Sequence, residues 1–207
     1  DEDKQNIQTL LSQAINEGRV ATTLSPNNPV NWEILGSIYR QISGVAQNAL
    51  TFSLDSYGRA IQKDPLNPLL RLTVGGIYYS AKNFDMAIRF FSDAVNLKPD
   101  YANAYYNLAV ALKDKGDLVS AASSAERTVS LLDPKSPDYQ AASDLLASLK
   151  DQIASETAKQ QATEQQTTAP AAKTNSALQD KNLPKVLDLP KPENIATPPA
   201  VKKQTQE

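Results

Sequence analysis

The sequence contains no cysteine and no histidine. Without cysteine, the chain can form no disulfide, no thiolate metal site and no cysteine nucleophile, and without histidine it can form no Ser-His-Asp triad. A metal ion could be held only by oxygen ligands, and no acidic loop with EF-hand spacing is present. We therefore expect no catalytic residue, no metal site and no cofactor, and predict that the chain is not an enzyme.

The sequence also lacks long apolar runs and a strong charge of one sign. No apolar run approaches the length of about 20 residues that a membrane helix requires, so direct membrane insertion is not expected. The net charge is -2, which does not favour nucleic acid as a partner. The chain begins with Asp1 rather than Met, which we interpret as a processed form or a fragment. The absence of cysteine fits an exported protein and fits a cytosolic one almost as well, and between the two we favour an extracytoplasmic or secreted protein over a cytoplasmic one.

The strongest positive feature is a repeat with a period of 34 residues. The positions that recur one period later are Tyr57, Ala60 and Pro65, which return as Phe91, Ala94 and Pro99, and Gly75 and Ala87, which return as Ala109 and Ala121. A fixed period of this length indicates a stack of small units, none of which can bury its apolar face alone. The repeat therefore favours binding or assembly as the function, rather than catalysis.

Each unit is predicted to contain two helices. Residues 67–81 carry apolar side chains at helical spacing, with Asn67 as a suitable N-cap and Pro68 in the first turn. Asn83 interrupts this pattern, and a second helix follows it. Gly75 is expected to lie where the two helices cross closely, and Phe91 to fill the remaining space between them.

The pattern resembles the tetratricopeptide repeat (TPR). Residues 32–39, with the sequence WEILGSIY, are similar to the start of that family's signature, and Ala87, Phe91, Ala94 and Pro99 are similar to its second half. The resemblance implies an all-α fold: a TPR-type right-handed solenoid of helical hairpins, with a C-terminal capping helix and a Pro-rich extended tail. It also implies that the first helix of each unit lines a concave groove.

The chain is predicted to have four segments. Residues 1–27 form an orphan helix, a half repeat, because Ala14, Ala21 and Pro26 have the spacings of a second helix. Residues 28–135 form three TPR units, residues 136–158 a capping helix, and residues 159–207 a disordered or extended tail rich in Pro, Thr and Gln. The orphan helix leaves an apolar stripe uncovered, which makes Leu11 and Ile15 a candidate association surface.

The first unit is longer than the others. Trp32 lies 39 residues before Arg71, and the surplus falls near residues 41–52. We favour a second helix with one extra turn, and the alternative is a protruding contact surface.

The groove positions implied by the resemblance have an apolar and aromatic middle and charged ends. The candidate partner-binding residues are Glu33, Arg40, Leu69, Leu72, Tyr79, Asn103, Tyr106, Val110 and Lys113. The groove of this family that binds chaperone C-termini clamps a carboxylate with Lys, Arg and Asn. The corresponding positions here are mostly Ser, Leu, Gly and Val, which does not favour that ligand. In an alternative interpretation, Tyr79 and Tyr106 only pack between units.

The tail contains one stretch that resembles a short linear ligand. Residues 183–192, with the sequence LPKVLDLPKP, combine the aliphatic side chains of Val186, Leu187 and Leu189 with prolines and alternating charges. An ordinary linker with scattered aliphatic residues is the alternative. We also interpret Thr167, Thr168 and Thr197 as candidate sites of O-linked glycosylation, from composition alone.

Two functions follow from these observations. The first is a non-enzymatic TPR protein–protein interaction and assembly module, whose partner is a protein or peptide segment or another copy of itself, with self-association into an exported structural assembly or filament. The alternative rests on residues 67–117, which look like the soluble C-terminal TPR domains of bacterial membrane glycan polymerases or ligases of the O-antigen type. In that case this chain is the extramembrane part of a longer protein.

Overall fold

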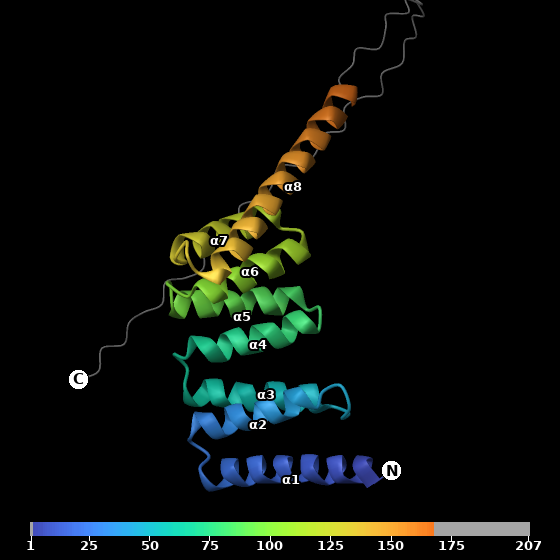
Figure 1. Cartoon of the computed structure of the whole chain (residues 1–207), viewed down its shortest axis with the longest axis vertical. Coiled ribbons are helices and arrows are strands. Elements are labelled where there is room, and N and C mark those ends of the chain that lie inside the picture. The colour runs from blue at the N-terminus through green and yellow to red at the C-terminus, as the bar shows by residue number, and fades with distance from the viewer. Residues whose placement is uncertain (1, 168–207) are drawn as a thin grey trace, which may run out of the picture. The chain divides into compact units, whose positions relative to one another are not determined.

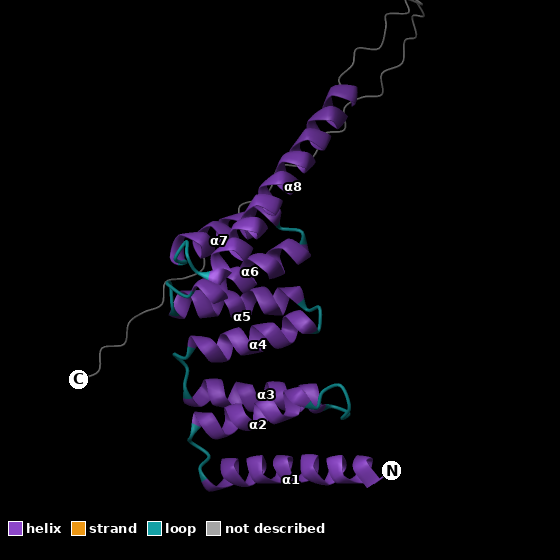
Figure 2. Ribbon diagram, in the orientation of Figure 1, coloured by secondary structure: helices purple, strands orange, loops and turns teal. Residues whose placement is uncertain are grey.

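The computed structural model describes residues 2–167, and this part of the chain consists of eight α-helices with no strand. Figures 1 and 2 show the helices stacked in chain order, each beside the next, with short loops between them. The helices are α1 (Glu2–Leu24), α2 (Pro29–Gln41), α3 (Ala49–Lys63), α4 (Pro68–Ser80), α5 (Phe84–Leu97), α6 (Ala102–Lys115), α7 (Leu118–Leu131) and α8 (Pro137–Thr167). The all-α solenoid expected from the repeat is confirmed. None of the described helices is both long and apolar enough to cross a membrane.

The helices form hairpins in the register of the repeat. The pairs α2 and α3, α4 and α5, and α6 and α7 each pack closely, while α1 packs on α2 and α8 packs on α7. The two end helices therefore each have one packed neighbour in the stack where an inner helix has two.

Short polar side chains begin the helices at the positions that the sequence indicates. The side chain of Asn67 accepts a hydrogen bond from the Leu69 N–H at 3.0 Å, and Pro68 occupies the first turn of α4. Asn83 caps α5 in the same way through the Met86 N–H at 3.2 Å. At the other end of a helix, Gly116 ends α6 with φ of 94°, a backbone conformation that favours glycine. These caps fix where each hairpin turns.

Size complementarity holds the two helices of a hairpin together. A Cβ built on Gly75 in α4 would lie 2.5 Å from the Phe91 ring in α5, so the missing side chain makes room for the ring. Gly36 and Tyr57 have the same relation in the first hairpin, where the separation would be 2.9 Å. In each pair a glycine lets the helices approach closely enough for an aromatic ring to fill the space between them.

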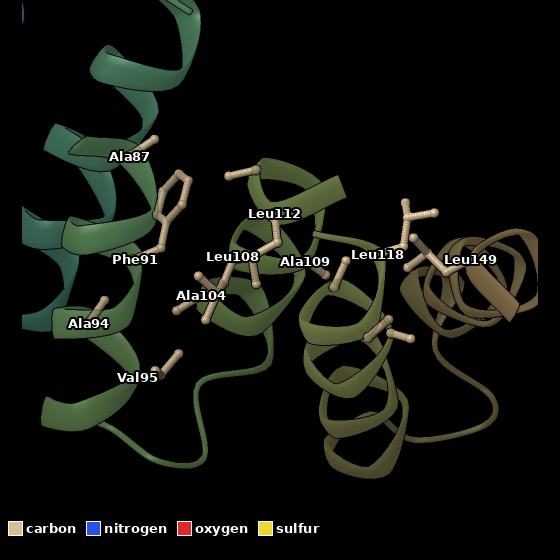
Figure 3. Packing of buried hydrophobic residues seen from close by; sticks show 14 residues of the cluster. Ala87, Phe91, Ala94, Val95, Ala104, Leu108, Ala109, Leu112, Leu118 and Leu149 are labelled. Carbon is tan, nitrogen blue, oxygen red and sulfur yellow. The ribbon is translucent and has the colours of Figure 1, made fainter. Parts of the chain in front are cut away.

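The largest buried cluster continues from one unit to the next. Figure 3 shows Phe91 of α5 directed toward α6, where Leu108 and Leu112 lie, and Leu118 of α7 beside Leu149 of α8. Small residues such as Ala87 and Ala94 are fully buried along α5. Burial of these faces against neighbouring units is the main source of stability in a stack of this kind.

The extra residues of the first unit do not lengthen its second helix. Helix α3 has 15 residues and the corresponding helix α5 has 14, so the extra-turn interpretation is wrong. The surplus forms a loop over residues 42–48, which replaces the tight turn at residues 81–83 of the next hairpin. Gly44 disfavours helix in this loop, and Asn48, at φ of 60°, adopts the left-handed conformation before α3. The Val45 side chain in this loop is 80% exposed.

The terminal helix is longer than the sequence analysis expected. Helix α8 continues beyond residue 158 to Thr167, so the predicted boundary between capping helix and tail was too early. Residues 159–167 are mainly Ala, Gln, Glu, Lys and Thr, and the first four types favour helix without providing an apolar face. Apolar periodicity indicates a helix only as far as its packed face extends, and in α8 that face ends at Ile153, which contacts the core cluster.

Candidate partner-binding groove

The first helices of the three hairpins contribute to one open cavity, which we call the central cavity. Its volume is about 790 Å³, and its lining comes from α2, α4 and α6, the loop after α2 and the start of α3. Arg40, Leu72 and Asn103, all predicted as partner-binding residues, line this cavity together with Gly76 and Asn107. The fold therefore brings together residues that lie up to 67 positions apart in the sequence.

The central cavity offers three kinds of contact. Leu72 supplies an aliphatic wall, and a Cβ built on Gly76 would meet no atom within 4 Å, so this glycine leaves the cavity open. Arg40 is exposed and takes part in none of the ion pairs formed among residues 2–167. Asn107 donates to the Asn103 Oδ1 at 2.7 Å, which leaves other amide groups of the pair available to a ligand. Asn107 was not singled out from the sequence.

A second cavity of about 540 Å³ adjoins the first. Asn103 lines both cavities, and the second is also lined by Tyr106 of α6, Leu132 at the end of α7 and Asp138 of α8. Tyr106, predicted as a partner-binding residue, therefore lines this second cavity. The contributions of Leu132 and Asp138 were missed, because the resemblance directs attention to the first helix of each unit only. The end of α7 and the start of α8 extend the groove toward the C-terminal end of the stack.

Tyr79, predicted as a groove residue, lines neither cavity and has a structural role. Its hydroxyl donates to the Asp114 Oδ2 at 2.5 Å and so joins α4 to α6, while its ring lies 5.8 Å from that of Phe84. The hydrogen bond to Asp114, followed by partial burial, raises the pKa of Tyr79 to about 12. Lys113 lies 3.9 Å from the other carboxylate oxygen of Asp114. The packing interpretation thus describes what Tyr79 does in the free chain.

The remaining predicted groove residues lie on the same helices but line neither cavity. Glu33 is half-buried on α2, Leu69 is exposed at the start of α4, and Val110 and Lys113 are half-buried on α6. The predicted tail ligand, Val186, Leu187 and Leu189, lies outside the described residues, as do Thr168 and Thr197. Among the described residues, no group of three or more acidic side chains is placed to hold a metal ion.

The predicted N-terminal association surface borders a third cavity. Leu11 and Ile15 line it from α1, and Ile42, Val45 and Ala46 line it from the loop after α2, with a volume of about 520 Å³. The sequence analysis missed the loop residues, although the length surplus of the first unit marked their position. We call Ile7, Leu11, Ile15, Ile42, Val45 and Ala46 the N-terminal surface.

Comparison of α1 with α5 shows what is uncovered at this end. Ala87 and Ala94 of α5 are fully buried, whereas Ala14 and Ala21, at the equivalent positions of α1, are only half-buried. Leu10 of α1 is 63% exposed. Helix α1 therefore presents the contact face of a second helix without a first helix packed on it.

Comparisons with known proteins agree with this architecture. Residues 75–116, from α4 to the end of α6, match the family model described as TPR repeat. A stretch of 65 residues is 35% identical to the probable UDP-N-acetylglucosamine–peptide N-acetylglucosaminyltransferase SEC of Arabidopsis thaliana. That match covers 31% of this chain and 7% of the relative, so it relates a short segment and not the two whole proteins.

Solved structures share the fold over most of the chain. MamA is similar with a TM-score of 0.59 at 20% identity, covering 73% of this chain and 84% of that one. TTC0263, a thermophilic TPR protein of Thermus thermophilus, gives 0.56 at 20% identity, with 69% and 76% covered. The first TPR of Spaghetti (RPAP3), bound to the HSP90 peptide SRMEEVD, gives 0.52 at 24% identity, with 61% and 94% covered. At these identities the likeness establishes the fold. The match to the family model identifies residues 75–116 as TPR repeat, and the likeness to solved TPR structures shows that the described stack has the same fold.

Proposed function

We propose that this chain is a non-enzymatic protein–protein interaction module whose groove binds an extended peptide segment. The observation that carries the proposal is the central cavity, which is open, about 790 Å³ in volume, and lined by three successive hairpins. The RPAP3 structure contains a peptide bound to a TPR stack of the same fold, which supports a peptide as the class of ligand.

The lining of the groove specifies the chemistry of the peptide. Leu72 and the open space beside Gly76 accommodate an aliphatic side chain, whose burial contributes about 1.5–3 kcal/mol. The amides of Asn103 and Asn107 can hydrogen-bond to the backbone of an extended peptide, and Arg40 can pair with an acidic side chain. The preferred ligand is therefore an aliphatic segment with one acidic residue, and not a cluster of acidic residues.

A second part of the proposal concerns assembly. The N-terminal surface is exposed at Ile7 and Val45, and α1 has no first helix packed on it, so this end of the stack suits a second copy of the same chain. Self-association through this surface would contribute to the exported structural assembly or filament that the sequence analysis expects. No observation on residues 2–167 favours the alternative of a glycan-polymerase tail.

The groove can be tested with one glycine substitution and a matched control. Gly76→Leu places a side chain at the central cavity, where its Cβ meets no atom within 4 Å, while Gly58→Leu makes the same change in α3, where a Cβ also meets nothing within 4 Å. Both variants should gain helix propensity and stay folded. A displayed library of random peptides, selected on the wild-type chain, should yield aliphatic sequences that bind the control and not Gly76→Leu. Equal binding of the selected peptides to all three proteins, or no selection at all, would overturn the proposal.

A further inference from the structure

The central cavity and the tail of the chain have complementary chemistry. Resting on the proposed peptide-binding function, we propose that the occupant of the central cavity is residues 183–192 of a second copy of this chain. The proposal combines the lining of the cavity, the period of the tail sequence and the length of chain between the end of α8 and this segment.

The tail segment has an amphipathic pattern with a period of three. A polyproline II helix has three residues per turn, and the prolines at 184, 190 and 192 favour this conformation in a bound segment. In that conformation Leu183, Val186 and Leu189 share one face and Lys185, Asp188 and Lys191 share another. The third face carries Pro184, Leu187 and Pro190. Two of the three faces are therefore wholly apolar, and all charges lie on the face of Lys185, Asp188 and Lys191. A linker without a binding role has no reason to carry this pattern.

This pattern fits the groove in charge and in apolar surface. The aliphatic faces would contact Leu72 and the space beside Gly76. Asp188, at the centre of the charged face, would then pair with Arg40, the exposed cation at the cavity that makes no ion pair within residues 2–167.

The length of α8 favours a second copy over the chain's own tail. Beyond Ile153, the last α8 residue in contact with the core cluster, the helix continues to Thr167 and rises by about 21 Å. Figure 1 shows this part of α8 projecting beyond the stack. Fifteen residues, 168–182, separate the end of α8 from this segment. The chain's own segment would have to return past the end of α8 and along the stack to α4, whereas the groove of a neighbouring copy requires no such reversal.

The direct test is the binding of a labelled peptide of residues 181–194 to the full chain, measured by fluorescence anisotropy. The control peptide exchanges Leu187 and Asp188, which keeps the composition and moves the charge to an apolar face. We expect the native peptide to bind wild type and Gly58→Leu, and to lose binding to Gly76→Leu. Arg40→Glu should weaken binding about 5-fold, as expected for an exposed ion pair of about 1 kcal/mol, and the peptide variant Asp188→Lys should recover that loss with Arg40→Glu. Equal binding of the native and exchanged peptides would overturn the proposal.

Light scattering on the full chain then identifies the source of the segment. A tail bound by a second copy gives a molar mass that rises with protein concentration and returns to that of a monomer with Val186→Asp or Gly76→Leu. A chain that stays monomeric at every concentration, yet binds the native peptide better after removal of residues 168–207, holds its own tail in the groove and overturns the second-copy proposal. If library peptides bind the groove while the 181–194 peptide does not, this inference fails and the proposed function stands. If neither binds, both fail.

Discussion

The adjacent glycines Gly75 and Gly76 should respond in opposite ways to the same substitution. Both lie in α4, so Gly→Ala at either position gains about 1 kcal/mol of helix propensity. Gly76 faces open space, and Gly76→Ala should therefore stabilise the chain by up to this amount. Because the two positions share one helix, the comparison between them removes most of the propensity term and isolates the packing term.

The packing term at Gly75 can be worked out from the Phe91 ring. An added Cβ would lie 2.5 Å from Cε1 and 2.6 Å from Cδ1, so the ring would have to move by about 1 Å to restore van der Waals contact. Phe91 of α5 is only 1% exposed, and its ring is directed toward α6, which leaves it little room to move. Overpacking of this kind costs about 1–3 kcal/mol. Gly75→Ala should therefore be less stable than Gly76→Ala by about that amount.

Circular dichroism at 222 nm during thermal unfolding measures this difference. A change of 1 kcal/mol shifts the Tm of a chain of this size by about 2–4 °C, so the two variants should differ by at least about 2 °C. Gly36→Ala, whose Cβ would lie 2.9 Å from the Tyr57 ring, should fall between them. Combining Gly75→Ala with Phe91→Leu should cost less than the sum of the two single changes. Equal Tm values for Gly75→Ala and Gly76→Ala would refute the size-complementarity argument.

Three further predictions address the Tyr79–Asp114 hydrogen bond, the N-terminal surface and the tail. The Tyr79 pKa is raised to about 12 from a usual value of 10, so the hydrogen bond to Asp114 stabilises the fold below pH 10 and its contribution is lost between pH 10 and 12. In a titration followed by tyrosinate absorbance at 295 nm, wild type should show a component near pH 12 that is absent from Tyr79→Phe, and a wild-type titration complete near pH 10 would contradict this. Leu11→Glu combined with Ile15→Glu, in a variant whose circular-dichroism spectrum stays helical, should lower the mass of any assembly measured by sedimentation, and an unchanged mass distribution would exclude the N-terminal surface. Removal of residues 168–207 should weaken self-association and leave the helical melt unchanged, because the clusters that stabilise the stack lie within residues 2–167. A lowered Tm would show that the tail also stabilises the stack.

Much of the local structure was predictable because it depends on residues close together in the chain. Asn67 and Pro68 begin a helix through contacts within one turn, and the helical period places Gly75 at the crossing and Gly76 on the groove side. The fixed period of 34 residues then defines which helices are equivalent, and hence that α2, α4 and α6 share a side of the stack. These features need no knowledge of distances between units.

The errors concern features for which local periodicity carries no information. The sequence pattern shows that the first unit has extra residues near 42–48 but does not indicate their conformation. They form an exposed loop rather than a helical turn. Helix α8 extends beyond its apolar face to Thr167, because the helix propensity of the residues there continues the helix without packing.

The sequence by itself determined the repeat, the hairpins and their caps, because each follows from short-range sterics and a fixed period, while the expected side of the groove came from the resemblance to the TPR family. Only the tertiary structure decided which residues share a cavity. Asn107 and Leu132 joined the groove, and Val45 came to lie beside Leu11, because side chains from separate helices meet at positions set by helix spacing and loop path. The same packing joined Tyr79 to Asp114, 35 residues away, and left Arg40 without an ion pair among the described residues.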